Sequence, residues 1–177
     1  MFLYLAMIDS DADKSKFEIL YSEYKNLMYY TANRILRNSS DAEDVVHQAF
    51  LKVIEILDTI SSPRCHKTRA LIVTITEHKA IDLYREKQRR NFLPLAEEYI
   101  GAAPAAEIER LAERDTLAAA IAALPPRYRS VLLLRCDCGY SNAEIANILD
   151  TTEPNVRKLI QRAKEKLSAK LRGTEEP

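Results

Sequence analysis

The sequence predicts an all-α protein with two domains: an N-terminal helical bundle linked to a C-terminal helix-turn-helix domain. Three observations support this fold class. The 177 residues are enough for one medium domain or two small ones, and apolar residues recur at helical spacing over most of the chain. The three Gly and seven Pro lie between these periodic stretches or near their ends. The content of 47% apolar and 29% charged residues is that of ordinary globular proteins, and it excludes the disordered and collagen-like classes.

Three amphipathic stretches predict the N-terminal bundle, residues 1–90. The first follows an apolar pattern over residues 17–36. The second opens with Ser-Asp-Ala-Glu at 40–43, a capping box in which the Ser hydroxyl and the Glu carboxylate satisfy each other's exposed amides. This stretch then carries a single apolar stripe over 42–57. The third helix is predicted from about residue 67 to residue 90.

Residues 91–112 are acidic and weakly patterned, and they predict a linker between the domains. The C-terminal domain, residues 113–177, then begins with an Ala-rich helix around Leu117. Leu124-Pro125-Pro126 ends that helix, because proline lacks the amide hydrogen that a helix interior needs. A further helix is predicted over residues 127–138.

The last two predicted helices indicate a helix-turn-helix. A second capping box, Ser141–Glu144, opens a short helix, residues 150–151 form a tight turn, and Pro154 suits the first turn of the next helix. Residues 154–172 contain seven basic side chains and one acidic one. In such motifs the second helix enters the major groove, where Arg and Gln reach base edges. The alternative is a solvated helix face. The candidate DNA contacts are Asn155, Arg157, Lys158, Gln161, Arg162 and Lys164.

The formal net charge of zero is a sum of opposed blocks. The balance is −4 over residues 1–60, +5 over 64–90, −4 over 91–126 and +3 over 127–177. Two separate basic blocks can therefore meet phosphate, although the total gives no basic surplus.

Other patterns exclude further classes of protein. The three cysteines give no disulfide framework, which favours a reducing cytoplasm. The apolar start, residues 1–8, is too short to span a bilayer and has no preceding basic residue, so neither a signal peptide nor membrane insertion is expected. The acidic run at 9–13 starts like a calcium loop, but the Gly and the final Glu of such a loop are missing.

No enzyme, cofactor or metal site is expected. Cys136 and Cys138, even with Cys65, lack the ligand spacing of a structural zinc site. The three histidines are scattered, and no glycine-rich phosphate loop is present.

Four segments carry a family resemblance. They are DAEDVVHQAFLK at 41–52, KAIDLYR at 79–85, LPPRYR at 124–129, and GYSNAEIA at 139–146 together with VRKLIQRAK at 156–164. Each is weak alone, but their order and spacing are specific. The sequence resembles a sigma-70 family factor of the small, two-domain extracytoplasmic-function (ECF) group, which directs bacterial RNA polymerase to promoters.

The resemblance implies roles for both domains. The second helix would lie on the clamp of the largest polymerase subunit, through Asp41, Asp44, His47, Gln48 and Leu51. Many relatives have Glu where Gln48 stands, and often Trp where Leu71 stands. Without the resemblance, the face of this helix would be taken for an ordinary solvated surface. The last helix would read the −35 element. The third helix and its preceding loop would melt and read the −10 element, through Arg64, Lys67, Arg69, His78, Lys79, Tyr84, Arg85 and Arg89.

The implied partners are core RNA polymerase and promoter DNA, and the resemblance admits an anti-sigma factor. Two alternatives come from other classes of protein. One is a stand-alone helix-turn-helix repressor or activator that binds operator DNA without polymerase. The other is a structural helical adaptor whose basic faces are only solvated.

Overall fold

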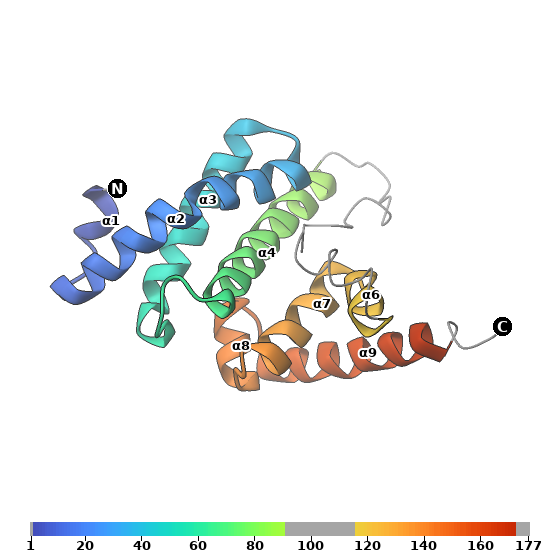
Figure 1. Cartoon of the computed structure of the whole chain (residues 1–177). Coiled ribbons are helices and arrows are strands. Elements are labelled where there is room, and N and C mark those ends of the chain that lie inside the picture. Colours follow the sequence, from blue (N-terminus) through green and yellow to red (C-terminus); the bar gives the residue numbers. More distant parts are fainter. Residues whose placement is uncertain (1, 91–115, 173–177) are drawn as a thin grey trace. The chain divides into compact units, whose positions relative to one another are not determined.

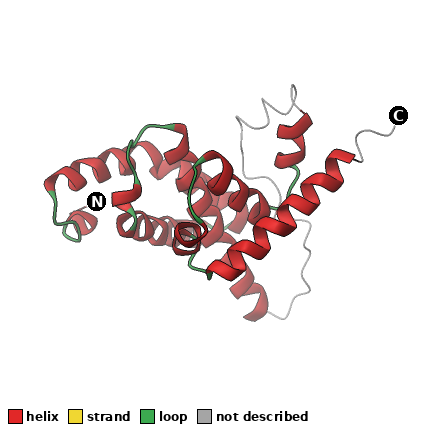
Figure 2. Cartoon of the chain, turned by 90° about the horizontal axis from the view of Figure 1, so that it is seen from below, coloured by secondary structure: helices red, strands yellow, loops and turns green. Residues whose placement is uncertain are grey.

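The computed structural model describes residues 2–90 and 116–172, and the chain divides into two compact units, Met1–Leu95 and Ala96–Pro177 (Figure 1). The predicted all-α class is confirmed: Figure 2 shows helices joined by loops and turns, and no strand, over the described residues. The linker predicted for residues 91–112 lies outside them.

Over residues 2–90, unit 1 contains the α-helices α1 (Phe2–Leu5), α2 (Asp11–Leu36), α3 (Ser39–Glu55) and α4 (His66–Arg90). The three long helices, α2, α3 and α4, pack against one another. The predicted apolar stripes form their shared core, since these residues of all three helices are fully buried: Phe17, Leu20, Met28, Val45, Ala49, Phe50, Leu71, Ile72 and Ile75. Four residues of the predicted stripes are only partly buried: Leu27, Ile35, Ile54 and Leu83.

The connection between α2 and α3 differs from the prediction. Arg37 has a left-handed φ of 52°, and its amide donates to the Asn33 carbonyl at 2.8 Å, which ends α2. Asn38 is extended, and its side-chain oxygen accepts from the Asp41 amide at 3.0 Å. The N-cap of α3 is therefore Asn38, and the capping box predicted at Ser40 is wrong. Asn caps a helix as well as Ser does, so the immediate end of α2 decides which residue takes the position.

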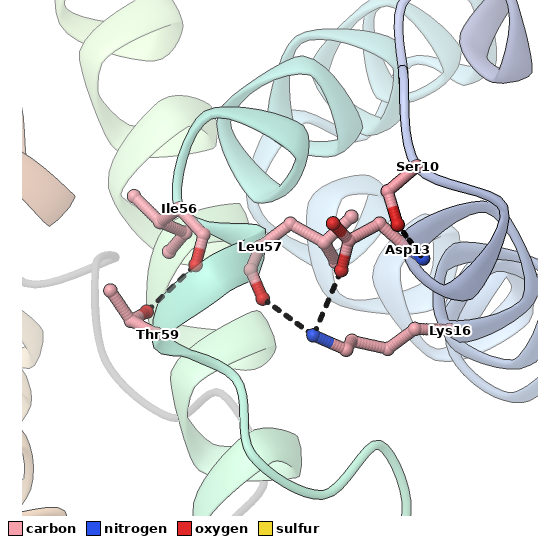
Figure 3. Close-up of polar contacts among 6 residues, drawn as sticks. All are labelled: Ser10, Asp13, Lys16, Ile56, Leu57 and Thr59. Atoms are coloured by element: carbon pink, nitrogen blue, oxygen red, sulfur yellow. Dashed lines mark hydrogen bonds and ion pairs between the residues drawn. The ribbon is translucent and has the colours of Figure 1, made fainter.

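The first turn of α2 is tied to the end of α3. Ser10 caps α2 by accepting from the Asp13 amide. Lys16 donates from Nζ to the Leu57 carbonyl at 3.3 Å and pairs with Asp13 at 3.1 Å (Figure 3). Leu57 belongs to the 3₁₀ turn Leu57–Thr59 that follows α3. α2 therefore begins six residues before the first apolar position of the predicted stripe, because its first turns are held by polar contacts.

Unit 2 contains α6 (Thr116–Ala122), α7 (Pro126–Leu132), α8 (Asn142–Ile148) and α9 (Glu153–Arg172). The sequence predicted a helix that continues to residue 138, but the α-helical part, α7, ends at Leu132. It passes into a π-helical turn, Leu133–Asp137, because the Cys138 amide donates to the Leu133 carbonyl, five residues back, at 3.0 Å.

The core of unit 2 gathers apolar side chains from all of these helices. The buried ones are Ala120, Leu124, Tyr128, Val131, Leu132, Leu134, Ile145, Ala146, Ile148, Leu149, Val156 and Ala163. The predicted stripe of α9 is buried only at Val156 and Ala163, whereas Leu159, Ile160, Leu167 and Leu171 are partly buried. No helix among residues 2–90 and 116–172 is long and apolar enough to cross a membrane.

α4 encloses one ring nitrogen of His78. The Nε2 atom of His78 is buried and has no hydrogen-bond partner within the described part of the chain. The pKa of His78 is lowered from 6.5 to about 4, mainly because burial disfavours the charged imidazole. The neighbouring Asp82 carboxylate raises this pKa, and Arg85 lowers it. Between pH 6.5 and 4, the unfolded chain therefore binds a proton at this residue that the folded chain does not.

The free energy of unfolding is thus expected to fall as the pH drops from 6.5 to 4, with a contribution from His78 of about 3 kcal/mol at the lower end. Urea denaturation at several pH values, followed by circular dichroism, measures this loss. His78→Gln should reduce the fall in the free energy of unfolding between pH 6.5 and 4 by that amount. His66→Gln, which removes an exposed imidazole, should show the same fall as the wild type. Equal pH dependence of the wild type and His78→Gln would contradict the enclosure of His78.

Candidate nucleic-acid and protein interfaces

The exposed face of α9 carries all six predicted DNA-contacting side chains. Val156 and Ala163 turn one side of the helix into the core of unit 2. The opposite side presents the predicted residues, each of which is exposed: Asn155, Arg157, Lys158, Gln161, Arg162 and Lys164. The structure therefore brings this whole predicted set together on one helix.

Internal contacts divide these residues into two groups. Arg157 donates from Nη2 to the Glu153 carboxylate at 2.6 Å, and Gln161 donates from Nε2 to Glu165 at 3.1 Å. The Asn155 amide donates to the Thr151 hydroxyl at 2.9 Å. In contrast, three cations of the same face have no hydrogen bond or ion pair with another described residue: Lys158, Arg162 and Lys164. This second group can bind an anion without breaking a contact with any described residue.

The turn before α9 is fixed by its own backbone and by a cap. The predicted capping box of α8 is confirmed: the Ser141 amide donates to the Glu144 carboxylate at 2.7 Å, and the Glu144 amide donates to the Ser141 hydroxyl at 3.2 Å. Hydrogen bonds from the side chain and the amide of Ser141 to the Glu144 carboxylate lower the pKa of Glu144. Asp150 has a φ of 47°, and the Thr151 amide donates to the Ala146 carbonyl at 2.9 Å. α8, the turn and α9 thus form the predicted helix-turn-helix.

In unit 1, the loop before α4 is held at three points. Tyr24, a buried residue of α2, donates its hydroxyl to the Pro63 carbonyl at 2.8 Å. Thr68 donates its hydroxyl to the Ser62 carbonyl at 2.6 Å, and its amide donates to the Cys65 sulfur at 3.4 Å. Burial raises the pKa of Tyr24, and the hydrogen bonds from Thr68 lower that of Cys65. The loop backbone is therefore anchored to α2 and to the first turn of α4.

The predicted basic residues of this region lie along the loop and α4, and their exposure varies. Arg64, Lys67, Arg69 and Arg89 are exposed, whereas His78, Lys79, Tyr84 and Arg85 are partly buried. Arg64 pairs with Glu23 of α2 at 3.0 Å. The Tyr84 hydroxyl accepts from the Gln88 amide at 2.9 Å. Leu71, which stands at the position expected to be Trp in many relatives, is buried and belongs to the three-helix core of unit 1.

The predicted docking residues lie on α3, and two of them already have partners. Asp44, His47 and Gln48 are exposed, and Asp41 and Leu51 are partly buried. Lys87 of α4 donates to the Asp41 carboxylate at 2.5 Å. The Tyr4 hydroxyl of α1 and Nδ1 of His47 are hydrogen-bonded at 2.6 Å.

Sequence reasoning missed the contacts of Tyr4, Tyr24 and Lys87, because each of them joins residues that are 39 to 46 positions apart. The only signal for Tyr24 was its place in the apolar stripe of α2, which predicts burial of the ring but not the partner of its hydroxyl. Among the residues that the structure describes, no group of three or more His, Cys, Asp or Glu side chains could hold a metal ion.

Comparison with known proteins decides the family. Residues 20–90 match the protein family described as Sigma-70 region 2, and residues 114–167 match the family described as Sigma-70, region 4. The ferric citrate uptake sigma factor FecI of Escherichia coli is 31% identical over 158 residues, which are 84% of this chain and 87% of FecI. The chain belongs to the sigma-70 family.

A second relative belongs, by its name, to the ECF group of that family. The ECF RNA polymerase sigma factor SigW of Bacillus subtilis is 26% identical over 90% of this chain and 91% of SigW. Among solved structures, the sigma factor RpoE in complex with the anti-sigma factor NepR from Bartonella quintana is 16% identical, with a TM-score of 0.42, over 86% of this chain and 94% of RpoE. CnrH in complex with the cytosolic domain of CnrY is 27% identical, with a TM-score of 0.39, over 90% of this chain and 89% of CnrH.

As an ECF sigma factor, the chain directs transcription initiation with RNA polymerase at promoter DNA. The matched regions contain the two candidate interfaces. Region 2 covers α3, the anchored loop and α4, and region 4 covers the helix-turn-helix.

Proposed function

We propose that unit 1 of this sigma factor docks on the clamp of core RNA polymerase and opens the −10 element, while α9 of unit 2 reads the −35 duplex. The observation that carries this division is the α9 face, where six candidate contacts are exposed together beside a capped and fixed turn. In these terms residues 1–90 and 113–177 are the two functional domains, and residues 91–112 link them.

At the −35 element, Arg162 is the strongest candidate for base readout. Its guanidinium is exposed and has no partner among the described residues, so a bidentate contact to guanine costs no internal ion pair. Lys158 and Lys164 are open in the same way and suit phosphate contacts. Arg157 would first have to leave Glu153. Gln161 and Asn155 would likewise exchange an internal hydrogen bond for one to DNA.

At the −10 element, the anchored loop and α4 supply cations and a fixed backbone. Opening a duplex requires positive charge for the phosphates and a surface that holds an unstacked base. Arg64, Lys67, Arg69 and Arg89 are exposed and supply charge. The partly buried Lys79, Tyr84 and Arg85 line the same helix, and the exposed ring of His66 at the start of α4 can stack on a base. The enclosure of His78 Nε2 favours a supporting role for this residue beneath the DNA-facing side.

On α3, the residues that remain open for docking are Asp44, Gln48 and Leu51. Asp41 is paired with Lys87, so it joins α3 to α4 and presents less charge to a partner. A Gln at position 48, where many relatives have Glu, replaces a charge contact with a neutral hydrogen bond. Docking on the clamp would therefore depend on polar contacts around one apolar anchor.

The remaining features agree with a transcription factor of the cytoplasm. Cys65, Cys136 and Cys138 form no disulfide with one another, as expected in a reducing compartment. Sigma factors generally act without an enzymatic step of their own, and we propose the same for this chain. The family also admits an anti-sigma factor as a partner.

A gel shift with and without core enzyme tests the proposed function. The free protein should bind a duplex promoter fragment weakly, and addition of core polymerase should give a sequence-specific complex whose affinity falls steeply with salt. Tight binding by the free protein alone would support the stand-alone repressor or activator. A complex whose stability does not depend on salt would support the helical adaptor.

The loop anchor predicts a second result. Tyr24→Phe keeps the buried ring but removes the hydroxyl that holds Pro63, a hydrogen bond of about 1 kcal/mol. We expect the yield of open complex, measured by permanganate reactivity of −10 thymines, to fall about fivefold, with affinity for core polymerase unchanged. Tyr29→Phe, a substitution of the same kind on α2, serves as the control. Equal melting by both variants would show that this anchor does not act in promoter opening.

The exposed guanidinium of Arg162, which has no partner among the described residues, predicts a third result. Arg162→Ala should cost about 1–3 kcal/mol of discrimination between a cognate and a scrambled −35 element, measured as the ratio of holoenzyme affinities. Arg172→Ala removes the same type of side chain from the last turn of α9 and should leave that ratio unchanged. If Arg162→Ala weakens binding equally on all −35 sequences, Arg162 contacts only phosphate.

A further inference from the structure

The N-terminal segment of unit 1 is built into the three-helix core. Tyr4 of α1 is only 8% exposed. Its ring centroid lies 5.5 Å from that of Phe17, 5.9 Å from Tyr21 and 5.8 Å from Phe50, so α1 rests on both α2 and α3. Tilted aromatic contacts of this kind add to the area that they bury and fix the position of a short helix. α1 therefore has a defined place beside α3.

Tyr4 also reaches the face of α3 that we propose for docking. Its hydroxyl is hydrogen-bonded to Nδ1 of His47 at 2.6 Å, and the two ring centroids are 5.3 Å apart. His47 nevertheless stays exposed, and Gln48, next to it in the chain, is exposed as well. α1 thus lies at the edge of that face, holds one of its side chains in place and leaves the face open.

Large apolar side chains project from the same segment. Leu3 is 70% exposed and Met7 is 56% exposed. Among the residues whose exposure the structure describes, the other exposed large apolar side chains are Tyr30 at 56% and Leu117 at 45%, and each stands alone in the sequence. Single exposed apolar residues are common, but two within five residues, beside an interaction surface, indicate a contact with a partner.

We propose that α1 and the turn after it are part of the polymerase-docking surface, with Leu3 of α1 and Met7 of the turn in apolar contact with core polymerase and Tyr4 holding His47 in position. This inference rests on the proposed docking role of α3. The docking face of α3 is polar and has Leu51 as its one apolar anchor, partly buried in its own unit. Stable interfaces need an apolar centre inside a polar rim. α1 supplies the missing apolar area at the edge of the same face, and Tyr4 makes the two surfaces continuous.

The test is equilibrium binding of the labelled full-length protein to core polymerase. The double variant L3S/M7S removes two exposed apolar side chains and leaves the aromatic contacts of Tyr4 in place, and its far-ultraviolet circular dichroism should match that of the wild type. We expect its Kd for core polymerase to rise about tenfold, because two apolar side chains at the edge of the interface lose a part of the area that they bury there. Tyr30→Ser is the matched control, because Tyr30 is also 56% exposed but lies on α2, away from α1. Its Kd should stay within twofold of that of the wild type.

The outcomes separate this inference from the proposed function. A wild type that binds core polymerase, together with an L3S/M7S variant that binds as well or better, overturns the role of α1 alone. A wild type that does not bind core polymerase overturns the docking proposal itself. The alternative partner of Leu3 and Met7 is a second copy of this chain, and sedimentation without polymerase tests it. If the wild type dimerises and L3S/M7S does not, these residues contact a second copy, and the inference is wrong.

Discussion

The burial of one apolar face on each helix is the constraint on which both interfaces depend. In unit 1 the core formed around Phe17 and Phe50 uses the apolar stripes of α2, α3 and α4, so the charged residues of those helices must lie outside it. In unit 2, Val156 and Ala163 are the buried side chains of α9, so most of the surface of this helix is left to basic side chains. The same packing that stabilises each unit therefore also presents its charge.

Polar contacts then set the local geometry that packing leaves open. Lys16 holds the start of α2 against the turn after α3, and Tyr24 and Thr68 hold the loop before α4. The ion pair between Lys87 and Asp41 joins a basic block to an acidic one within unit 1. Charge that appears as opposed blocks along the chain is thus partly neutralised in space, and the cations of α9 that have no partner among the described residues are the ones most open to DNA.

The sequence predicted the features that depend on local periodicity and spacing. The three long helices of unit 1, the capping box at Ser141 and the basic face of α9 all follow from neighbours within one or two turns. The N-cap of α3 was placed wrongly, because Asn38 and Ser40 cap equally well and only the left-handed Arg37 decides between them. The Tyr4–His47 contact, the loop anchors and the enclosure of His78 could not be predicted, since they depend on how distant helices pack.

The most direct measurement of the central claim is transcript mapping on a promoter library with randomised upstream sequence, transcribed by core polymerase with and without this protein. If the two units act as an ECF sigma factor, the protein should create new start sites that share one −35 and one −10 sequence at a fixed spacing. Start sites identical to those of core polymerase alone, on every template, would contradict it.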